Sequence, residues 1–157
     1  MAGPSEADLA ELADRLAIQS LLVRYAWAID TKDWALLDSV FTPDAFLDYS
    51  SNPGGAKGPY PEIRAWLEAS LAYFPMTQHL VTNIDVVVDG DAATARTLVY
   101  NPMGAATREG PLHHFFLGGR YDDRLVRTAQ GWRIAERVET IMWFDGTLPD
   151  ELVAPGS

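Results

Sequence analysis

The sequence of 157 residues contains no cysteine. Disulfide bonds, thiolate nucleophiles and cysteine-ligated metal sites are therefore excluded. Positive charge is also scarce, because 12 lysine and arginine residues stand against 22 aspartate and glutamate residues, a formal net charge of −10. A chain with this charge repels phosphate backbones and anionic lipid surfaces, so neither nucleic acid nor a membrane is an expected partner.

Long apolar runs are missing as well, and no stretch approaches the roughly 20 residues that span a bilayer. Residues 1–10 are acidic and lack the basic-then-apolar order of a signal peptide, so a cytoplasmic location is expected. Phosphate-binding loops, nucleophile elbows and zinc-ligand patterns are absent from the sequence. No further ligand is placed to complete a metal site with His113 or His114, so we expect neither a metal nor a cofactor.

Apolar residues are plentiful: they make up 48% of the sequence, with five tryptophan, six tyrosine and six phenylalanine residues among them. This content is enough to build a core and still line a cavity. The length fits a single domain, which we expect over residues 6–150, with loose ends at 1–5 and 151–157.

The first half of the sequence predicts helices. Apolar residues recur at three- and four-residue spacing from Leu9 to Ile29, which predicts a helix over about residues 6–30, capped by Ser5 or Asp8. The further elements expected in this half are a helix at 33–40, a strand at 45–49, a loop at 51–58 and a helix at 61–73.

After Pro75 the pattern changes to alternation, which is typical of strands. Asp89-Gly90 and Gln130-Gly131 are hairpin turns in this interpretation. Strands are expected at 77–81, 85–88, 93–100, 113–126 and 132–144, with a looser stretch at 101–110. Helices first and a curved, mostly antiparallel sheet after them indicate an α+β fold.

Several segments resemble one known family. Residues 14–30 and 40–45 are similar to the opening of SnoaL-like domains, 77–83 to their histidine strand, and 118–123 and 131–137 to their last two strands. On these segments the chain resembles the SnoaL-like branch of the nuclear-transport-factor-2-like superfamily, with scytalone dehydratase, hexachlorocyclohexane dehydrochlorinase and bile-acid 7α-dehydratase. The resemblance implies a cone-shaped fold with a mixed, mostly antiparallel sheet, an apolar pocket, no cofactor, and a homodimer or homotrimer.

The same resemblance places Asp30 and His79 at the catalytic pair of those enzymes, in which the aspartate orients the histidine and the histidine removes a proton. Neutral imidazole accepts protons near pH 7, and a carboxylate on its other nitrogen stabilises the imidazolium that forms. Spacing alone favours ordinary structural roles, in which Asp30 ends a helix and His79 is a satisfied core residue.

Six further residues are candidates for the pocket. The resemblance makes Tyr25 an auxiliary acid and Arg137 an anion anchor; their alternatives are a core aromatic and an ion pair with Glu139. The remaining substrate-binding candidates are Tyr49, Tyr100, His114 and Trp27. Adjacent strand residues point to opposite faces, so at most one of His113 and His114 enters the pocket. Residues 145–149 are expected to cover its mouth.

The predicted function is that of a cofactor-independent lyase of the dehydratase type, acting on a hydrophobic cyclic molecule such as a steroid, terpenoid or polyketide. Two alternatives stay open. The same pocket suits an isomerase or polyketide cyclase, since a fold does not decide the chemistry. The second alternative is a non-catalytic module that binds a small molecule or forms dimers.

Overall fold

The computed structural model describes residues 3–108, 110–149 and 152. Three helices lie in the first half of the chain: α1 (Glu6–Thr31), α2 (Trp34–Asp38) and α3 (Tyr60–Leu71). The strands among these residues are β1 (Phe41–Asp48), β2 (Lys57–Pro59), β3 (Met76–Thr77), β4 (Leu80–Asp89), β5 (Ala92–Ala105), β6 (His113–Thr128) and β7 (Gly131–Asp145).

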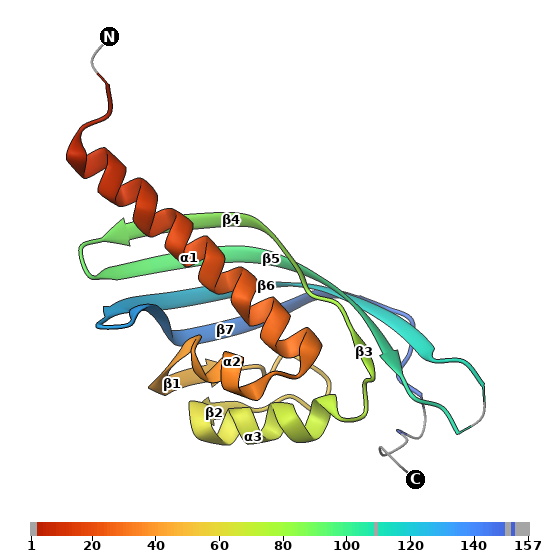
Figure 1. Ribbon diagram of the computed structural model, residues 1–157. Coiled ribbons are helices and arrows are strands. Elements are labelled where there is room, and N and C mark those ends of the chain that lie inside the picture. The colour runs from red at the N-terminus through yellow and green to blue at the C-terminus, as the bar shows by residue number, and fades with distance from the viewer. Residues whose placement is uncertain (1–2, 109, 150–151, 153–157) are drawn as a thin grey trace.

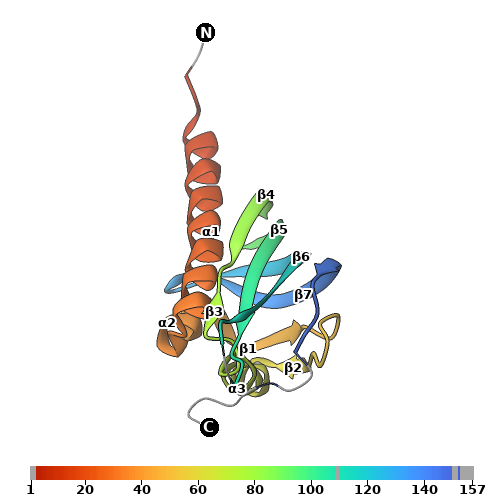
Figure 2. The same cartoon turned by 90° about the vertical axis from the view of Figure 1, so that its right-hand side faces the viewer.

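All the strands join one curved sheet, in the order β2-β1-β7-β6-β5, with both β3 and β4 paired to β5. The pairing of β1 with β7 is parallel, and the other pairings are antiparallel. The helix α1 runs across the sheet. The helix α3 is drawn below α1 and packs against β1 (Figure 1). Figure 2 shows the sheet curving from β4 round to β1 and β2. The predicted α+β cone with a mixed sheet is therefore confirmed.

The helix α1 begins at a capping box, in which the Ser5 hydroxyl accepts from the Asp8 amide and the Asp8 carboxylate accepts from the Ser5 amide. Ser5 therefore caps the helix, as one of the two predicted caps. It does not belong to the loose end that was expected over residues 1–5. Only the second half of the helix is buried, from Ile18 to Ile29. The periodic leucines at its start, Leu9, Leu12 and Leu16, are more than half exposed because these turns extend past the sheet (Figure 1).

The strand predicted at residues 77–81 is interrupted. β3 ends at Thr77 and β4 begins at Leu80, so His79 lies in the break between them. β4 then runs unbroken through residues 85–88, and β5 continues into the stretch that was expected to be loose. That stretch is a strand because it pairs with β6 as far as Ala105.

A buried ion pair lies between the helix α1 and the sheet. Arg137, fully buried, donates from Nε and Nη2 to the two carboxylate oxygens of Asp123, each at 2.7 Å. The Arg137 guanidinium lies 4.1 Å from the ring centroids of both Tyr25 and Tyr121, and these two rings meet edge-on. The alternative role expected for Arg137, an ion pair with Glu139, is therefore wrong, because the partner of Arg137 is Asp123. The rings add cation–π attraction to the charge pairing.

Aromatic side chains also gather on the outer face of the sheet. Tyr100 stacks on Phe116 and lies against Trp143, with ring centroids 6.4 and 5.8 Å apart. An added Cβ at Gly118 would come within 2.2 Å of the Trp143 ring, so glycine lets this indole lie flat on the strand. The expected self-association stays a prediction. Within the described part of the chain, no helix has the length and apolar content to cross a membrane.

Removing Asp123 should destabilise the fold strongly. Asp123→Ala leaves the Arg137 cation buried without its partner, which costs about 3–5 kcal/mol in such pairs. The matched control is Glu136→Ala, which breaks the exposed ion pair between Arg124 and Glu136 and should change stability little. Urea denaturation of the three proteins measures this, and equal small losses for both variants would contradict it.

Candidate active site

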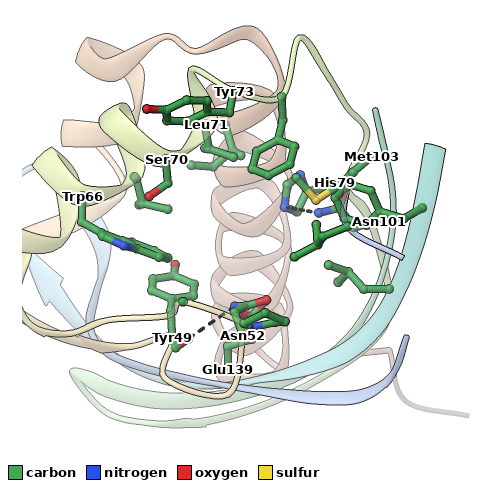
Figure 3. A pocket seen from close by; sticks show the side chains of 18 of the residues that line it. Tyr49, Asn52, Trp66, Ser70, Leu71, Tyr73, His79, Asn101, Met103 and Glu139 are labelled. Carbon is green, nitrogen blue, oxygen red and sulfur yellow. Dashed lines mark hydrogen bonds between the residues drawn. The ribbon is translucent and has the colours of Figure 1, made fainter. Parts of the chain in front are cut away.

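A cavity of about 300 Å³ opens between α1, α3 and the inner face of the sheet. Most of its wall is apolar, as is usual for a site that binds a small molecule. The apolar and aromatic lining includes Ile29, Trp66, Leu67, Leu71, Phe74, Met103, Phe115 and Leu117. A few polar side chains interrupt this wall: Tyr25, Tyr49, Asn52, Ser70, Tyr73, His79, Asn101, Tyr121 and Glu139 (Figure 3).

Asp30 and His79 form a tight pair at one side of the cavity. The last turn of α1 supplies Asp30, and the break between β3 and β4 supplies His79. Asp30 Oδ1 lies 2.6 Å from His79 Nδ1 and accepts from the Thr77 hydroxyl at 3.1 Å. Asp30 Oδ2 accepts from the His79 backbone N–H at 2.8 Å. This carboxylate therefore holds both the ring and the backbone of His79, and its position assigns a proton to Nδ1.

Asn101 faces the other ring nitrogen, 3.1 Å from His79 Nε2 (Figure 3). With the amide oxygen towards Nε2, the amide nitrogen donates to the carbonyls of Pro102 and Gln78 at 3.2 and 3.3 Å. We assign this orientation because it gives every polar atom of the amide a partner. In this orientation the Asn101 oxygen is placed to accept from Nε2. A half-turn of the amide would instead let Asn101 donate to the lone pair of neutral His79.

Three tyrosine hydroxyls are buried at the floor of the cavity, from Tyr25, Tyr49 and Tyr121. The Tyr25 and Tyr49 hydroxyls are hydrogen-bonded at 3.0 Å, and the Tyr25 ring meets the His79 ring edge-on. Burial raises the pKa of all three phenols well above the ordinary value. They therefore stay protonated and act as hydrogen-bond donors.

Glu139, on β7, is a second ionisable group in the cavity wall, and only 6% of it is exposed. The Asn52 side-chain amide donates to its carboxylate, and Tyr121 hydrogen-bonds to it as well. Burial raises the pKa of the Glu139 carboxyl, while Asn52, His79 and Arg137 oppose the rise. Glu139 is thus a carboxyl that holds its proton more firmly than an exposed one.

The structure brings four predicted residues together: Asp30, His79, Tyr25 and Tyr49. Four others lie outside the cavity, contrary to expectation, and each has a physical reason. Trp27 is two residues from Tyr25 on the helix, which turns it to the solvent side. Arg137 is fully buried against the rings of Tyr25 and Tyr121, which line the cavity in its place.

The other two misplaced residues, Tyr100 and His114, follow from strand alternation. Tyr100 is adjacent to Asn101, and His114 is adjacent to Phe115, and it is Asn101 and Phe115 that line the cavity. Neighbouring side chains of a strand point to opposite faces, so Tyr100 and His114 point away. His113 does not enter either: its Nε2 donates to the Thr147 carbonyl at 2.6 Å.

The sequence interpretation missed Asn101 and Asn52 and considered Glu139 only as an ion-pair partner. Alternation along β5 was the available signal for Asn101, because it predicts that one of Tyr100 and Asn101 faces inward. Nothing local marked Asn52, which reaches Glu139 from the loop after β1.

The segment after β7 lies against the cavity. Leu148, in the segment expected to cover the mouth, and Leu152 are among the lining residues, together with Phe144 near the end of β7. Within residues 3–108, 110–149 and 152, no three His, Cys, Asp or Glu side chains lie close enough together to hold a metal ion.

Comparison with known proteins places the chain in one family. The sequence profile of the SnoaL-like domain matches residues 10–138. The uncharacterized protein Rv2910c from Mycobacterium tuberculosis is 50% identical over 133 residues, which are 84% of this chain and 88% of that protein. The crystal structure of Kfla4162 from Kribbella flavida has 30% sequence identity and a TM-score of 0.78, over 86% of this chain and 95% of that one.

A hexachlorocyclohexane dehydrochlorinase, LinA-type3 from Novosphingobium barchaimii, shares the fold. Its TM-score is 0.76 at 19% identity, over 94% of this chain and 99% of that chain.

The raised pKa of Glu139 makes stability depend on pH. In the folded protein this carboxyl keeps its proton above the ordinary value of 4.5, whereas in the unfolded chain it does not. The free energy of unfolding therefore falls as pH rises from that value through the folded pKa. Glu139→Gln removes the titration, so its stability relative to the parent should increase as pH rises from 4.5 through the folded pKa of Glu139.

Urea denaturation at several pH values checks this, with the exposed Glu136→Gln as control. Parallel stability curves for the parent and Glu139→Gln would show that the Glu139 carboxyl titrates alike in both states.

Proposed function

Because this chain belongs to the SnoaL-like domain family, we propose that it is a cofactor-independent lyase that removes water from a hydrophobic cyclic small molecule. The observation that carries the proposal is the Asp30–His79–Asn101 chain of contacts at the wall of an apolar cavity. Histidine flanked on both sides in this way is suited to take a proton from carbon.

In this mechanism His79 reacts in its neutral form, with Nδ1–H bonded to Asp30 and the lone pair on Nε2. Nε2 takes the proton from the carbon next to a carbonyl group of the substrate. The imidazolium that forms is stabilised by the Asp30 carboxylate at 2.6 Å and by the Asn101 oxygen at 3.1 Å. Asn101 turns its amide as His79 gains the proton, which recovers its bonds to the Pro102 and Gln78 carbonyls.

The tyrosine hydroxyls support the same step. Proton removal next to a carbonyl places negative charge on the carbonyl oxygen, and fixed donors stabilise that charge in a dry site. Tyr25 and Tyr49 hold their protons and face the cavity, so they are the donors in this proposal. Tyr25 thereby acts as a hydrogen-bond donor, and its high pKa makes it a poor acid.

An isomerase is the second candidate, favoured by the same observation. A base and two hydroxyl donors are sufficient to move a proton between two carbons through an enolate. Product mass separates the two reactions, because dehydration lowers the mass by one water and isomerisation leaves it unchanged.

His79→Ala tests the proposed function. We expect turnover to fall by about 10²–10⁴-fold, the usual contribution of a general base, with the fold intact. The screen incubates the protein with hydroxylated steroids and aromatic polyketide intermediates and follows product mass. His114→Ala, an exposed histidine outside the cavity, is the control and should keep full activity. Undiminished turnover by His79→Ala would sink the proposal.

Asn101→Leu tests the second contact of His79. It removes a hydrogen bond to a charged group, worth about 1.5–3 kcal/mol, so kcat should fall roughly 10- to 150-fold. KM should change little, because the bond strengthens only as the imidazolium forms. A change in KM alone, with kcat retained, would mean that Asn101 only shapes the cavity.

A further inference from the structure

We propose that Glu139 is the acid of this cavity, protonating the departing hydroxyl group while His79 removes the proton from carbon. This inference rests on the proposed function and assigns a second proton-transfer residue to it. Hydroxide is a poor leaving group, so the loss of water needs a proton donor as well as a base.

Glu139 is placed for this role. Its carboxyl lines the cavity from β7, whereas His79 lines it from the break between β3 and β4. Figure 3 shows the Asn52–Glu139 pair and the His79–Asn101 pair on separate sides of the space. A ring bound between them meets a base at one side and a carboxyl at the other.

Ordinary structural roles do not require this carboxyl. The loop after β1 is already attached to β7 by the Ser51 hydroxyl, which donates to the Glu139 carbonyl and accepts from the Ile141 N–H, both at 3.0 Å. The nearby Arg137 cation has its own bidentate partner in Asp123. The loop and the buried cation therefore each have a partner other than the Glu139 carboxyl.

The surroundings also make Glu139 the stronger acid among the candidates. The groups that face it are Asn52, Tyr121, Tyr25, Tyr49, His79 and Arg137. Burial raises the pKa of its carboxyl above the ordinary value of 4.5, and it raises the phenol pKa values from 10 to well above that value. An acid works best when its pKa lies near the working pH, which favours the carboxyl over the phenols.

The step balances with these two residues alone. His79 Nε2 takes the proton from carbon, and the electrons of that bond form the new carbon–carbon double bond. The carbon–oxygen bond breaks, and the oxygen leaves as water with the proton of Glu139. His79 ends as an imidazolium and Glu139 as a carboxylate. Return of one proton from His79 to Glu139 through water restores the starting state.

His79 and Glu139 therefore hold one transferable proton between them, which is on Glu139 before the reaction and on His79 after it. This arrangement specifies the kind of leaving group that the substrate carries. A substrate that leaves as hydroxide needs Glu139, whereas one that leaves as halide needs no proton donor. A hydroxyl is therefore the leaving group that this pair of residues fits.

Two bicyclic probes separate the two residues. In D₂O, 1-tetralone can only exchange its α-hydrogens, which requires the base alone. The probe 3-hydroxy-1-tetralone can also lose water to an enone that tautomerises to 1-naphthol, which requires base and acid. The proteins compared are the parent, Glu139→Gln, His79→Ala, and the exposed Glu136→Gln as a matched control on the same strand.

We expect Glu139→Gln to keep the exchange of 1-tetralone and to lose the dehydration of 3-hydroxy-1-tetralone by roughly 10²-fold or more. Dehydration by Glu139→Gln at the parent rate would overturn the proposal for Glu139 and leave the role of His79 standing. Exchange by His79→Ala at the parent rate would overturn the proposed function itself.

Infrared spectra decide the question independently of turnover and of any misfolding by the variant. As pH rises, the parent should show one carboxyl C=O stretch that persists to higher pH than those of the exposed carboxyls, and that Glu139→Gln lacks and Glu136→Gln keeps. A parent spectrum without that band would show that Glu139 has no proton to give, and would overturn the proposal.

Discussion

The buried Arg137–Asp123 ion pair is the interaction on which the rest of the site depends. Asp123 and Arg137 lie on neighbouring strands, and the ring of Tyr25 from α1 covers the guanidinium at 4.1 Å. The cation therefore fixes the height and rotation of α1 over the sheet. Asp30 lies five residues further along that helix, where it meets His79, and Glu139 lies two residues beyond Arg137 on β7. Both sides of the proposed chemistry are thus positioned from one buried charge.

Arg137 also acts on the cavity from a distance. Its charge lowers the pKa of Tyr25, Tyr49 and Tyr121 and of Glu139, although burial outweighs it in each case. The resemblance suggested that this arginine binds an anion directly. Arg137 is buried behind Tyr25 and Tyr121 and does not line the cavity, so it makes no direct contact there. The electric field of its charge still favours negative charge in the cavity. The site thereby combines an apolar wall, suited to a hydrophobic ring, with stabilisation of a transient anion.

The sequence predicted the fold because periodicity and turn residues report directly on helices, strands and their order. It predicted the pairing of Asp30 with His79 only through family resemblance, since 49 residues separate the two. Trp27, Tyr100 and His114 were wrongly assigned to the pocket because that prediction rested on residue type. It did not determine which face of its helix or strand each side chain occupies. Asn101 and Glu139 were not recognised because their roles depend on what lies opposite them across the cavity. Leu9, Leu12 and Leu16 have helical spacing and yet are exposed, because helical spacing does not reveal where the sheet ends.

The central claim is that His79 presents Nε2 to the cavity as the nitrogen that gains and loses a proton, while Asp30 holds the proton on Nδ1. Nitrogen-15 spectra of histidine-labelled protein, recorded across neutral pH and assigned with His79→Ala, test this most directly. The account predicts a protonated Nδ1 in every spectrum and, in the neutral ring, a lone pair on Nε2. If Nε2 kept its proton while Nδ1 lost it, the lone pair would face Asp30, and the cavity would contain no histidine base.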